Sequence, residues 1–305
     1  PWADRVKGIL EAYLGGQAVG GAEYDILFGK VNPSAKLPET FPKQLEDNPS
    51  YLAGFGEGDH VEYREGIFVG YRYYDKKKMD VLFPFGYGLS YTTFAYSNLR
   101  LDKKTMKDTE ELTVSVDVTN TGDRAGKEVV QLYVADKEST VIRPVKELRD
   151  FVKIELAPGE TKTVTFTLGK RAFAYYDVQI HDWQVETGEF EILIGASSRD
   201  IALRDTVTVE STVKIPFHYT TDTTMGDIMS RPEAWKLVQS VLSKGMFGQG
   251  SEVNEGGDAA KEAISDEMNA AMLQYMPLRG PVSFGGGVSM ADVQKLVDRL
   301  NAMEK

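Results

Sequence analysis

Alternating hydrophobic and polar positions mark the middle of the chain as β-structure. Four aliphatic residues alternate with polar ones in one segment, at the period of a strand with one buried face: Leu112, Val114, Val116 and Val118. The segment around Ile192 repeats that period, and turn sequences such as Asn120-Thr121-Gly122-Asp123 separate the extended segments. Residues 93–212 are therefore expected to form about seven strands in an all-β, immunoglobulin-like or fibronectin type III-like sandwich. Because the sequence contains no cysteine, the fibronectin-like form fits better.

The first 92 residues mix helical and extended patterns. Five apolar residues fall at helical spacing just before Gly15-Gly16, which predicts a helix ending there: Val6, Ile9, Leu10, Tyr13 and Leu14. A second helix is expected over Gly20–Phe28, with Ala22, Ile26 and Leu27 facing inward. Prolines at 33, 38 and 42 favour an extended surface loop.

Tyr63–Asp75 is rich in aromatic and β-branched residues, which is typical of a strand. These elements are too few to complete an α/β layer. Residues 1–92 are therefore predicted to be the incomplete C-terminal portion of an α/β sandwich domain. Since the chain opens on Pro1 rather than Met, we expect further sequence upstream.

Residues 213–305 carry helical patterns and form a predicted α-helical C-terminal extension. Ser289 can cap a helix whose apolar stripe is Val293, Leu296, Val297 and Leu300. A preceding helix is expected to align Ile264, Met268, Met272 and Tyr275, after a glycine-rich stretch over Ser243–Asp258 that should be mobile. Eight of the ten methionines lie in this tail. They indicate either a partner or homo-oligomer surface or packing on the tail's own protein, and the second interpretation is favoured.

Composition excludes several classes of function. A formal net charge of -11 repels phosphate backbones, and the basic runs, Lys76-Lys77-Lys78 and Lys103-Lys104, are short, so no nucleic-acid partner is expected. No apolar run approaches the roughly 20 residues of a membrane span. The lack of cysteine removes disulfides and thiolate chemistry and suits a cytoplasmic location.

The side chains that carry catalysis in other proteins form no recognisable constellation here. His60, His181 and His218 lie outside any Gly-x-Ser-x-Gly elbow. Glu57, Asp59, His60 and Glu62 cluster, but their spacing matches no metal-ligand frame, so no metal site is expected. Glu65 and Asp75 are the one carboxylate pair that suggests glycoside hydrolysis, but ion pairs with Arg64 or Arg72 are the favoured interpretation.

Several longer strings resemble glycoside hydrolase family 3 of the β-glucosidase type, in the order in which that family has them. They cover about residues 1–210 and comprise Leu10–Ala18, Ile26–Gly29, Val31–Ser34, Tyr63-Arg64-Glu65-Gly66-Ile67-Phe68-Val69-Gly70-Tyr71-Arg72-Tyr73-Tyr74-Asp75, Phe83–Thr92, Asn120–Gly126 and Gly195–Ile201. One departure is Ala35, where the family usually has glycine, so the backbone there is expected to avoid a positive φ.

The resemblance implies a barrel, then an α/β sandwich, then a fibronectin-like domain, and a retaining β-glucosidase that hydrolyses terminal β-D-glucosyl residues without a cofactor. Its nucleophile is an Asp of the barrel and its acid/base a Glu upstream of this chain, so no catalytic residue is assigned here. Glu57-Gly58-Asp59-His60 resembles the acid/base context but follows the Asn-Pro-Ser motif, which rules it out. The chain is expected to supply scaffold and outer-subsite contacts through Tyr63 and Glu65.

A second interpretation remains, in which the chain is a non-catalytic carbohydrate-binding or oligomerisation module. Tyr175, Tyr176 and Trp183 could stack on sugar rings, although packing within the sandwich is the favoured role for them. The glycone also stays open between glucose, xylose, arabinose and N-acetylglucosamine, because the residues that select it are expected in the missing barrel. The expected partners are therefore a β-glucoside or oligosaccharide and the barrel half of the same protein.

Overall fold

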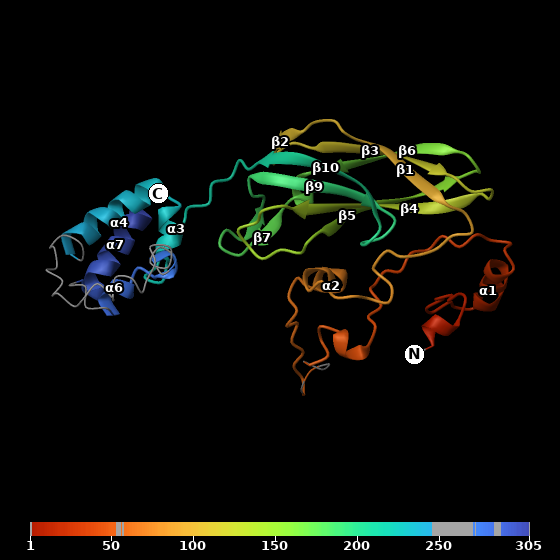
Figure 1. Cartoon of the computed structure of the whole chain (residues 1–305), viewed down its shortest axis with the longest axis horizontal. Coiled ribbons are helices and arrows are strands. Elements are labelled where there is room, and N and C mark those ends of the chain that lie inside the picture. The colour runs from red at the N-terminus through yellow and green to blue at the C-terminus, as the bar shows by residue number, and fades with distance from the viewer. Residues whose placement is uncertain are drawn as a thin grey trace, which may run out of the picture. The chain divides into compact units, whose positions relative to one another are not determined.

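Two compact units make up the chain, Pro1–Val213 and Lys214–Lys305. The computed structural model describes residues 2–52, 56, 58–245, 271, 273–283 and 288–304 (Figure 1). The first unit contains both the N-terminal segment and the β-sandwich, which pack on each other. The predicted α+β class with an all-β sandwich is confirmed.

The sandwich consists of two sheets, antiparallel except at one edge, and a small hairpin. One sheet has the order β1-β3-β6, from Phe94–Leu101, Leu112–Asn120 and Thr161–Leu168. The other has the order β2-β10-β9-β4-β5, from Thr105–Lys107, Ile201–Glu210, Gly188–Gly195, Gly126–Asp136 and Glu147–Leu156, with β2 parallel to β10. The hairpin pairs β7, Tyr175–Asp177, with β8, Asp182–Gln184.

The alternation that predicted strands has placed the expected side chains in the core. Leu112, Val114, Val116 and Val118 of β3 are fully buried against the facing sheet, as are Phe190, Ile192 and Ile194 of β9. β4 departs from simple alternation because both of its faces are covered. Leu132 belongs to the sandwich core, whereas its neighbour Tyr133 packs on Tyr71 of the N-terminal segment. A strand covered on both faces is expected to be largely apolar throughout.

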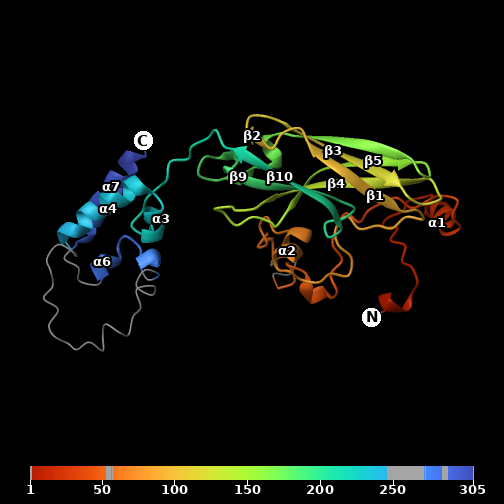
Figure 2. The ribbon, with the colours of Figure 1, turned by 45° about the horizontal axis from the view of Figure 1, so that its top comes forward.

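The N-terminal segment holds two short 3-10 turns, Ala3–Arg5 and Leu45–Asp47, and the helices α1, Val19–Leu27, and α2, Tyr71–Lys76. α2 lies against the sandwich in both ribbon views (Figures 1 and 2). The expected helix near Gly20–Phe28 is thus confirmed as α1, but only Ile26 of its expected inward residues is half-buried, since Ala22 and Leu27 are exposed.

Two elements expected in this segment are wrong. Residues 6–18 form no helix. Their five apolar side chains are each at least 40% exposed, and Leu14 is 101% exposed, so the stripe lacks the burial that a short helix needs. Tyr63–Asp75 is a turn followed by α2 rather than a strand. Gly66 and Gly70 take positive φ angles of 56° and 59°, which break an extended chain, and Tyr71 and Tyr74 bury one helical face. The φ of Ala35 is not positive, as expected.

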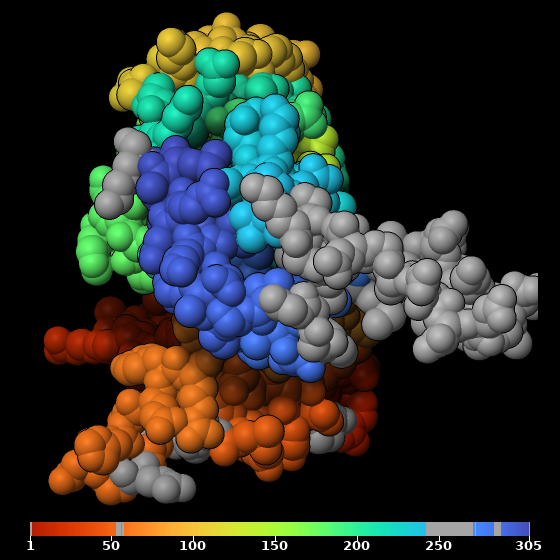
Figure 3. All heavy atoms as spheres, turned by 90° about the vertical axis from the view of Figure 1, so that its left-hand side faces the viewer, coloured from red at the N-terminus to blue at the C-terminus, as the bar shows by residue number. Residues whose placement is uncertain are grey.

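The second unit is helical and has a core of its own. It contains α3, Met225–Met229, α4, Pro232–Gly245, α6, Gly280–Ser283, and α7, Met290–Met303, and α4 and α7 lie side by side (Figure 3). The predicted Ser289 cap and the buried stripe of α7 are confirmed. In the preceding predicted helix, Ile264, Met268 and Met272 lie outside the described residues, and Tyr275 is 75% exposed.

The glycine-rich stretch also falls mostly outside the described residues, except that 243–245 end α4. In the part of the chain that the structure covers, no helix is long and apolar enough to cross a bilayer.

Candidate functional site

The loop before α2 carries the two residues that the sequence nominated for substrate contact. Tyr63 is 81% exposed and Glu65 is half-buried. Backbone hydrogen bonds from Gly66 N to Tyr63 O (3.1 Å) and from Phe68 N to Glu65 O (3.0 Å) shape the turn. Neither side chain hydrogen-bonds to another described residue, so both keep their polar groups free for a ligand.

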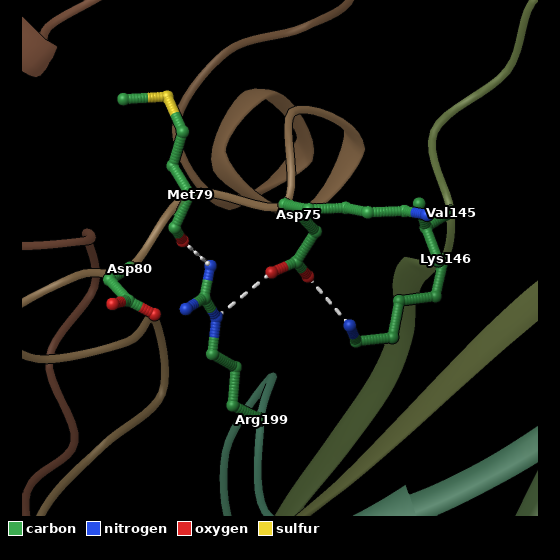
Figure 4. Close-up of a pocket in the computed structure, with 7 residues that line it drawn as sticks. Asp75, Met79, Asp80, Val145, Lys146 and Arg199 are labelled. Carbon is green, nitrogen blue, oxygen red and sulfur yellow. Dashed lines mark hydrogen bonds and ion pairs between the residues drawn. The ribbon is translucent and has the colours of Figure 1, made fainter.

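The second carboxylate of the proposed pair is engaged elsewhere. Asp75, whose side chain is 8% exposed, binds Lys146 Nζ at 2.6 Å and Arg199 Nε at 3.0 Å, one with each carboxylate oxygen (Figure 4). Arg199 also donates to the carbonyl of Met79 at 2.7 Å. Because cations take up both oxygens, Asp75 anchors α2 to the sandwich and is not free to attack or protonate a substrate.

The ion pairs expected for this segment involve other partners. Arg64 contacts Glu62, and Arg72 contacts Glu147 of β5 at 3.6 Å. Neither arginine therefore pairs with Glu65 or Asp75 as the sequence suggested. An open pocket of about 270 Å³ borders the Asp75 cluster and is also lined by Lys78, Asp80 and Val145.

Asn32 of the Asn-Pro-Ser motif holds the N-terminal segment against the β3–β4 turn. Its Nδ2 donates to the carbonyl of Ala125 at 3.0 Å. Its Oδ1 accepts from Ser90 Oγ at 2.9 Å and from Tyr91 N at 2.8 Å. The motif therefore has a positioning role in this chain, which its sequence alone did not reveal.

Gln131 forms a second polar anchor, on the outer face of β4. Its Nε2 donates to Gly86 O at 3.0 Å and Ala196 O at 2.7 Å, while its Oε1 accepts from Tyr133 Oη at 2.6 Å. Gly86 has a φ of 79°, and a Cβ on it would lie 2.1 Å from Gln131 Oε1. Glycine is therefore required at this close approach.

A buried ion pair and an aromatic cluster complete the junction. Lys36 Nζ lies 3.0 Å from Glu128 Oε1, and Tyr96 donates to the same oxygen at 3.2 Å. Burial, reinforced by Glu128, raises the pKa of Tyr96 far above its ordinary value. Tyr71 stacks on Phe85 with ring centroids 4.7 Å apart, and burial raises the pKa of its hydroxyl. The sandwich thus fixes the segment that follows the Tyr63 loop.

The candidate aromatic platform on the sandwich is largely occupied by protein. Tyr176 and Trp183 meet edge-on with centroids 5.5 Å apart, and the Arg171 guanidinium lies 3.2 Å from the centroid of the Trp183 ring. Tyr175 faces Arg143 at 5.7 Å. Tyr176 is therefore the member of the trio with the most surface left for a sugar ring. Across the described residues, no group of His and acidic side chains is arranged to hold a metal ion.

Comparison with known proteins identifies the two parts of the first unit. Residues 1–91 match the model of the glycosyl hydrolase family 3 C-terminal domain, and residues 128–198 match that of the fibronectin type III-like domain. Over all 305 residues the chain is 54% identical to thermostable beta-glucosidase B of Acetivibrio thermocellus, of which it spans 39%. The chain belongs to glycoside hydrolase family 3. It corresponds to the C-terminal part of such proteins.

Two further relatives match most of this chain. An exo-alpha-(1->6)-L-arabinopyranosidase of Bifidobacterium breve is 46% identical over 249 residues, which are 82% of this chain and 32% of that protein. The crystal structure of the Bifidobacterium adolescentis GH3 beta-glucosidase is 44% identical with a TM-score of 0.70, covering 78% of this chain and 35% of that one. The chain thus spans about two fifths or less of the length of these relatives.

Proposed function

We propose that this chain is the C-terminal portion of a retaining β-glucosidase that hydrolyses terminal β-D-glucosyl residues. The observation that carries the proposal is the 54% identity to a β-glucosidase along the entire chain. In this mechanism one carboxylate attacks the anomeric carbon, and a carboxylic acid protonates the leaving oxygen. The acid, now a carboxylate, then takes a proton from the water that displaces the first carboxylate and releases the sugar. The family resemblance assigns both groups to the remainder of the polypeptide. Asp75, the carboxylate that the sequence pairs with Glu65, serves as an anchor instead.

The proposed role of this chain is to hold the Tyr63 loop beside the catalytic domains. Three features support it. α2 follows the loop directly, Asp75 ties α2 to the sandwich, and Tyr71 packs against Phe85 and Tyr133. A loop attached to a rigid element can place a phenol and a carboxylate at an outer subsite. No cofactor enters this mechanism, and the cysteine-free sequence supports a cytoplasmic enzyme.

Turnover of p-nitrophenyl-β-D-glucoside tests the function. The full-length polypeptide is expected to release nitrophenol, and the 305-residue chain alone is expected to be inactive. Because one relative is an arabinopyranosidase, substrates with other glycones are compared with the glucoside. These are the β-xyloside, the α-L-arabinopyranoside and the N-acetyl-β-glucosaminide. If another glycone gives a higher kcat/KM than the glucoside, that glycone replaces glucose as the proposed substrate.

The loop residues are tested by Tyr63→Ala and Glu65→Ala in the full-length enzyme. Loss of one hydrogen bond to substrate predicts a fall of about 2- to 10-fold in kcat/KM for each. Tyr275→Ala is the matched control, because Tyr275 is also exposed but lies in the helical unit. This variant should leave the kinetics unchanged. Wild-type kinetics for both loop variants would remove Tyr63 and Glu65 from the substrate site.

A further inference from the structure

Two arginines at the junction between α2 and β5 share a single carboxylate. Arg72 Nε lies 3.6 Å from Glu147 Oε1, and Arg149 donates to Glu147 Oε2 at 2.6 Å. The side chains of Arg72 and Arg149 are 34% and 16% exposed. One acidic group therefore faces two guanidinium groups in a partly desolvated setting.

Both guanidinium groups have hydrogen-bonding capacity that the described residues do not use. The Nε atoms of Arg72 and Arg149 are each buried without a hydrogen-bond acceptor in the part of the chain that the structure describes. A guanidinium group presents five N–H donors, and buried donors are nearly always paired. Burial lowers the pKa of Arg149, with Glu147 opposing and Arg143 adding to the shift.

The other cationic groups nearby have hydrogen-bond partners of their own. Arg143 binds Asp136 at 2.9 Å and donates to the carbonyls of Phe173 and Ala174. It also lies 3.7 Å from Glu147, so it adds positive charge near the two arginines and brings them no further carboxylate. Lys76 donates to the Arg143 carbonyl. Lys146 is held by Asp75, as described above. Arg72 and Arg149 therefore share one carboxylate, Glu147, and have an excess of positive charge between them.

We infer that Arg72 and Arg149 form a binding site for one further carboxylate, supplied by an Asp or Glu of the remainder of the enzyme. A carboxylate is planar and has two oxygens that match N–H donors of neighbouring guanidinium groups. The length of the chain indicates where this carboxylate comes from. Since the chain spans 39% of the length of its thermostable relative, most of the surface that can face the two arginines belongs to the rest of the polypeptide. The inference rests on the proposed function only in taking this chain as part of a longer enzyme.

Sulfate serves as the probe for the site in the 305-residue chain. Its melting midpoint is measured in sodium sulfate and in sodium chloride at equal ionic strength, for the wild type, Arg149→Met and Arg204→Met. Sulfate stabilises proteins generally, so the exposed Arg204 of β10 gives the matched control. Binding at the site should raise the melting midpoint of the wild type and of Arg204→Met by about 2 °C beyond this general effect. Arg149→Met should show the general effect alone. An equal sulfate response in all three would overturn the inference.

The Arg72→Met variant repeats the test if Arg149→Met does not fold. The source of the carboxylate is then tested in the full-length enzyme, where the enzyme's own Asp or Glu should already fill the site. Sulfate should therefore shift the melting midpoint of the wild type and of Arg149→Met equally. Persistence of the larger wild-type shift at full size would mean a site for free anions and would also overturn the inference. Because these measurements follow melting, a full-length protein without glucosidase activity would contradict the proposed function alone.

Discussion

Tyr219 joins the beginning of the helical unit to its last helix. Its hydroxyl donates to Glu304 at 3.0 Å, and its backbone exchanges hydrogen bonds with the Asn301 side chain at 2.8 and 2.9 Å. Burial, followed by the hydrogen bond to Glu304, raises the pKa of Tyr219 to about 12. The neutral phenol is thus the form that the folded state favours.

This shift predicts alkaline unfolding of the helical unit. Since the folded pKa lies above the unfolded value of about 10, the stabilisation from Tyr219 is complete below about pH 10 and is lost as the pH rises to about 12. Tyr219→Phe should weaken the unit at neutral pH by about 1 kcal/mol but reduce its loss of stability across that interval. The helical signal in far-UV circular dichroism reports the change. Tyr275→Phe is the control, and identical alkaline profiles for Tyr219→Phe and wild type would contradict the prediction.

Individual side-chain roles were the part of the site that the sequence could least predict. Asn32 stood out only as part of a motif, because its acceptor Ala125 and its donor Ser90 lie far away along the chain. Gln131 interrupts the apolar pattern of β4, and that interruption was its one local signal. Pairings across such separations depend on the tertiary fold, which periodicity does not specify. Tyr63 and Glu65 stay predictions, since no contact in the structure tests them.

At the scale of elements, α2 shows how a short helix depends on its anchors. Asp75→Ala would leave Lys146 without its carboxylate in a largely buried position. We expect a loss of about 3 kcal/mol in the free energy of unfolding, the low end for breaking a buried ion pair, because Arg199 is partly exposed. Chemical denaturation of the chain measures this loss. Asp80→Ala, which removes the 85% exposed partner of Lys43, should change stability by less than about 1 kcal/mol. Equal losses for the two variants would show that Asp75 is no anchor.

The cap of α7 gives a second prediction for an element. Ser289 accepts from Asp292 N, and the Asp292 side chain accepts from Ser289 N, which forms a capping box. Ser289→Ala should destabilise the helical unit by about 1 kcal/mol. Thermal unfolding followed by circular dichroism measures the effect. Ser240→Ala is the matched control, because its hydroxyl only bonds back to Leu237 O within α4. A cap variant as stable as the control would rule out this contribution.

The sequence predicted elements correctly where their own periodicity decides the structure. β3 buries every second residue and α7 buries one helical stripe, so both patterns are complete within the element. Residues 6–18 have a helical pattern too, but their apolar side chains are not buried. The segment that became α2 is aromatic enough for a strand, and the glycines at 66 and 70 decide against it. Local pattern therefore failed where the outcome depends on neighbouring structure.

At the scale of the whole molecule, the two units have separate hydrophobic cores. The sandwich core includes Leu132, Phe166 and Ile192, whereas the helical core includes Tyr219, Val238 and Leu300. The contact pattern divides the chain between Val213 and Lys214. Each unit therefore has the packing needed to fold by itself.

Deleting residues 214–305 tests this independence and the role of the helical unit together. The truncated chain, residues 1–213, should keep a cooperative unfolding transition within a few degrees of that of the first unit in the whole chain, because no buried residue of the sandwich core comes from the described part of the helical unit. Its number of subunits, obtained by light scattering, should match that of the intact chain if the methionine-rich tail packs on its own unit. Met225, which is buried in the helical core, supports that outcome. A fall from dimer to monomer on deletion would instead establish the tail as an oligomerisation element.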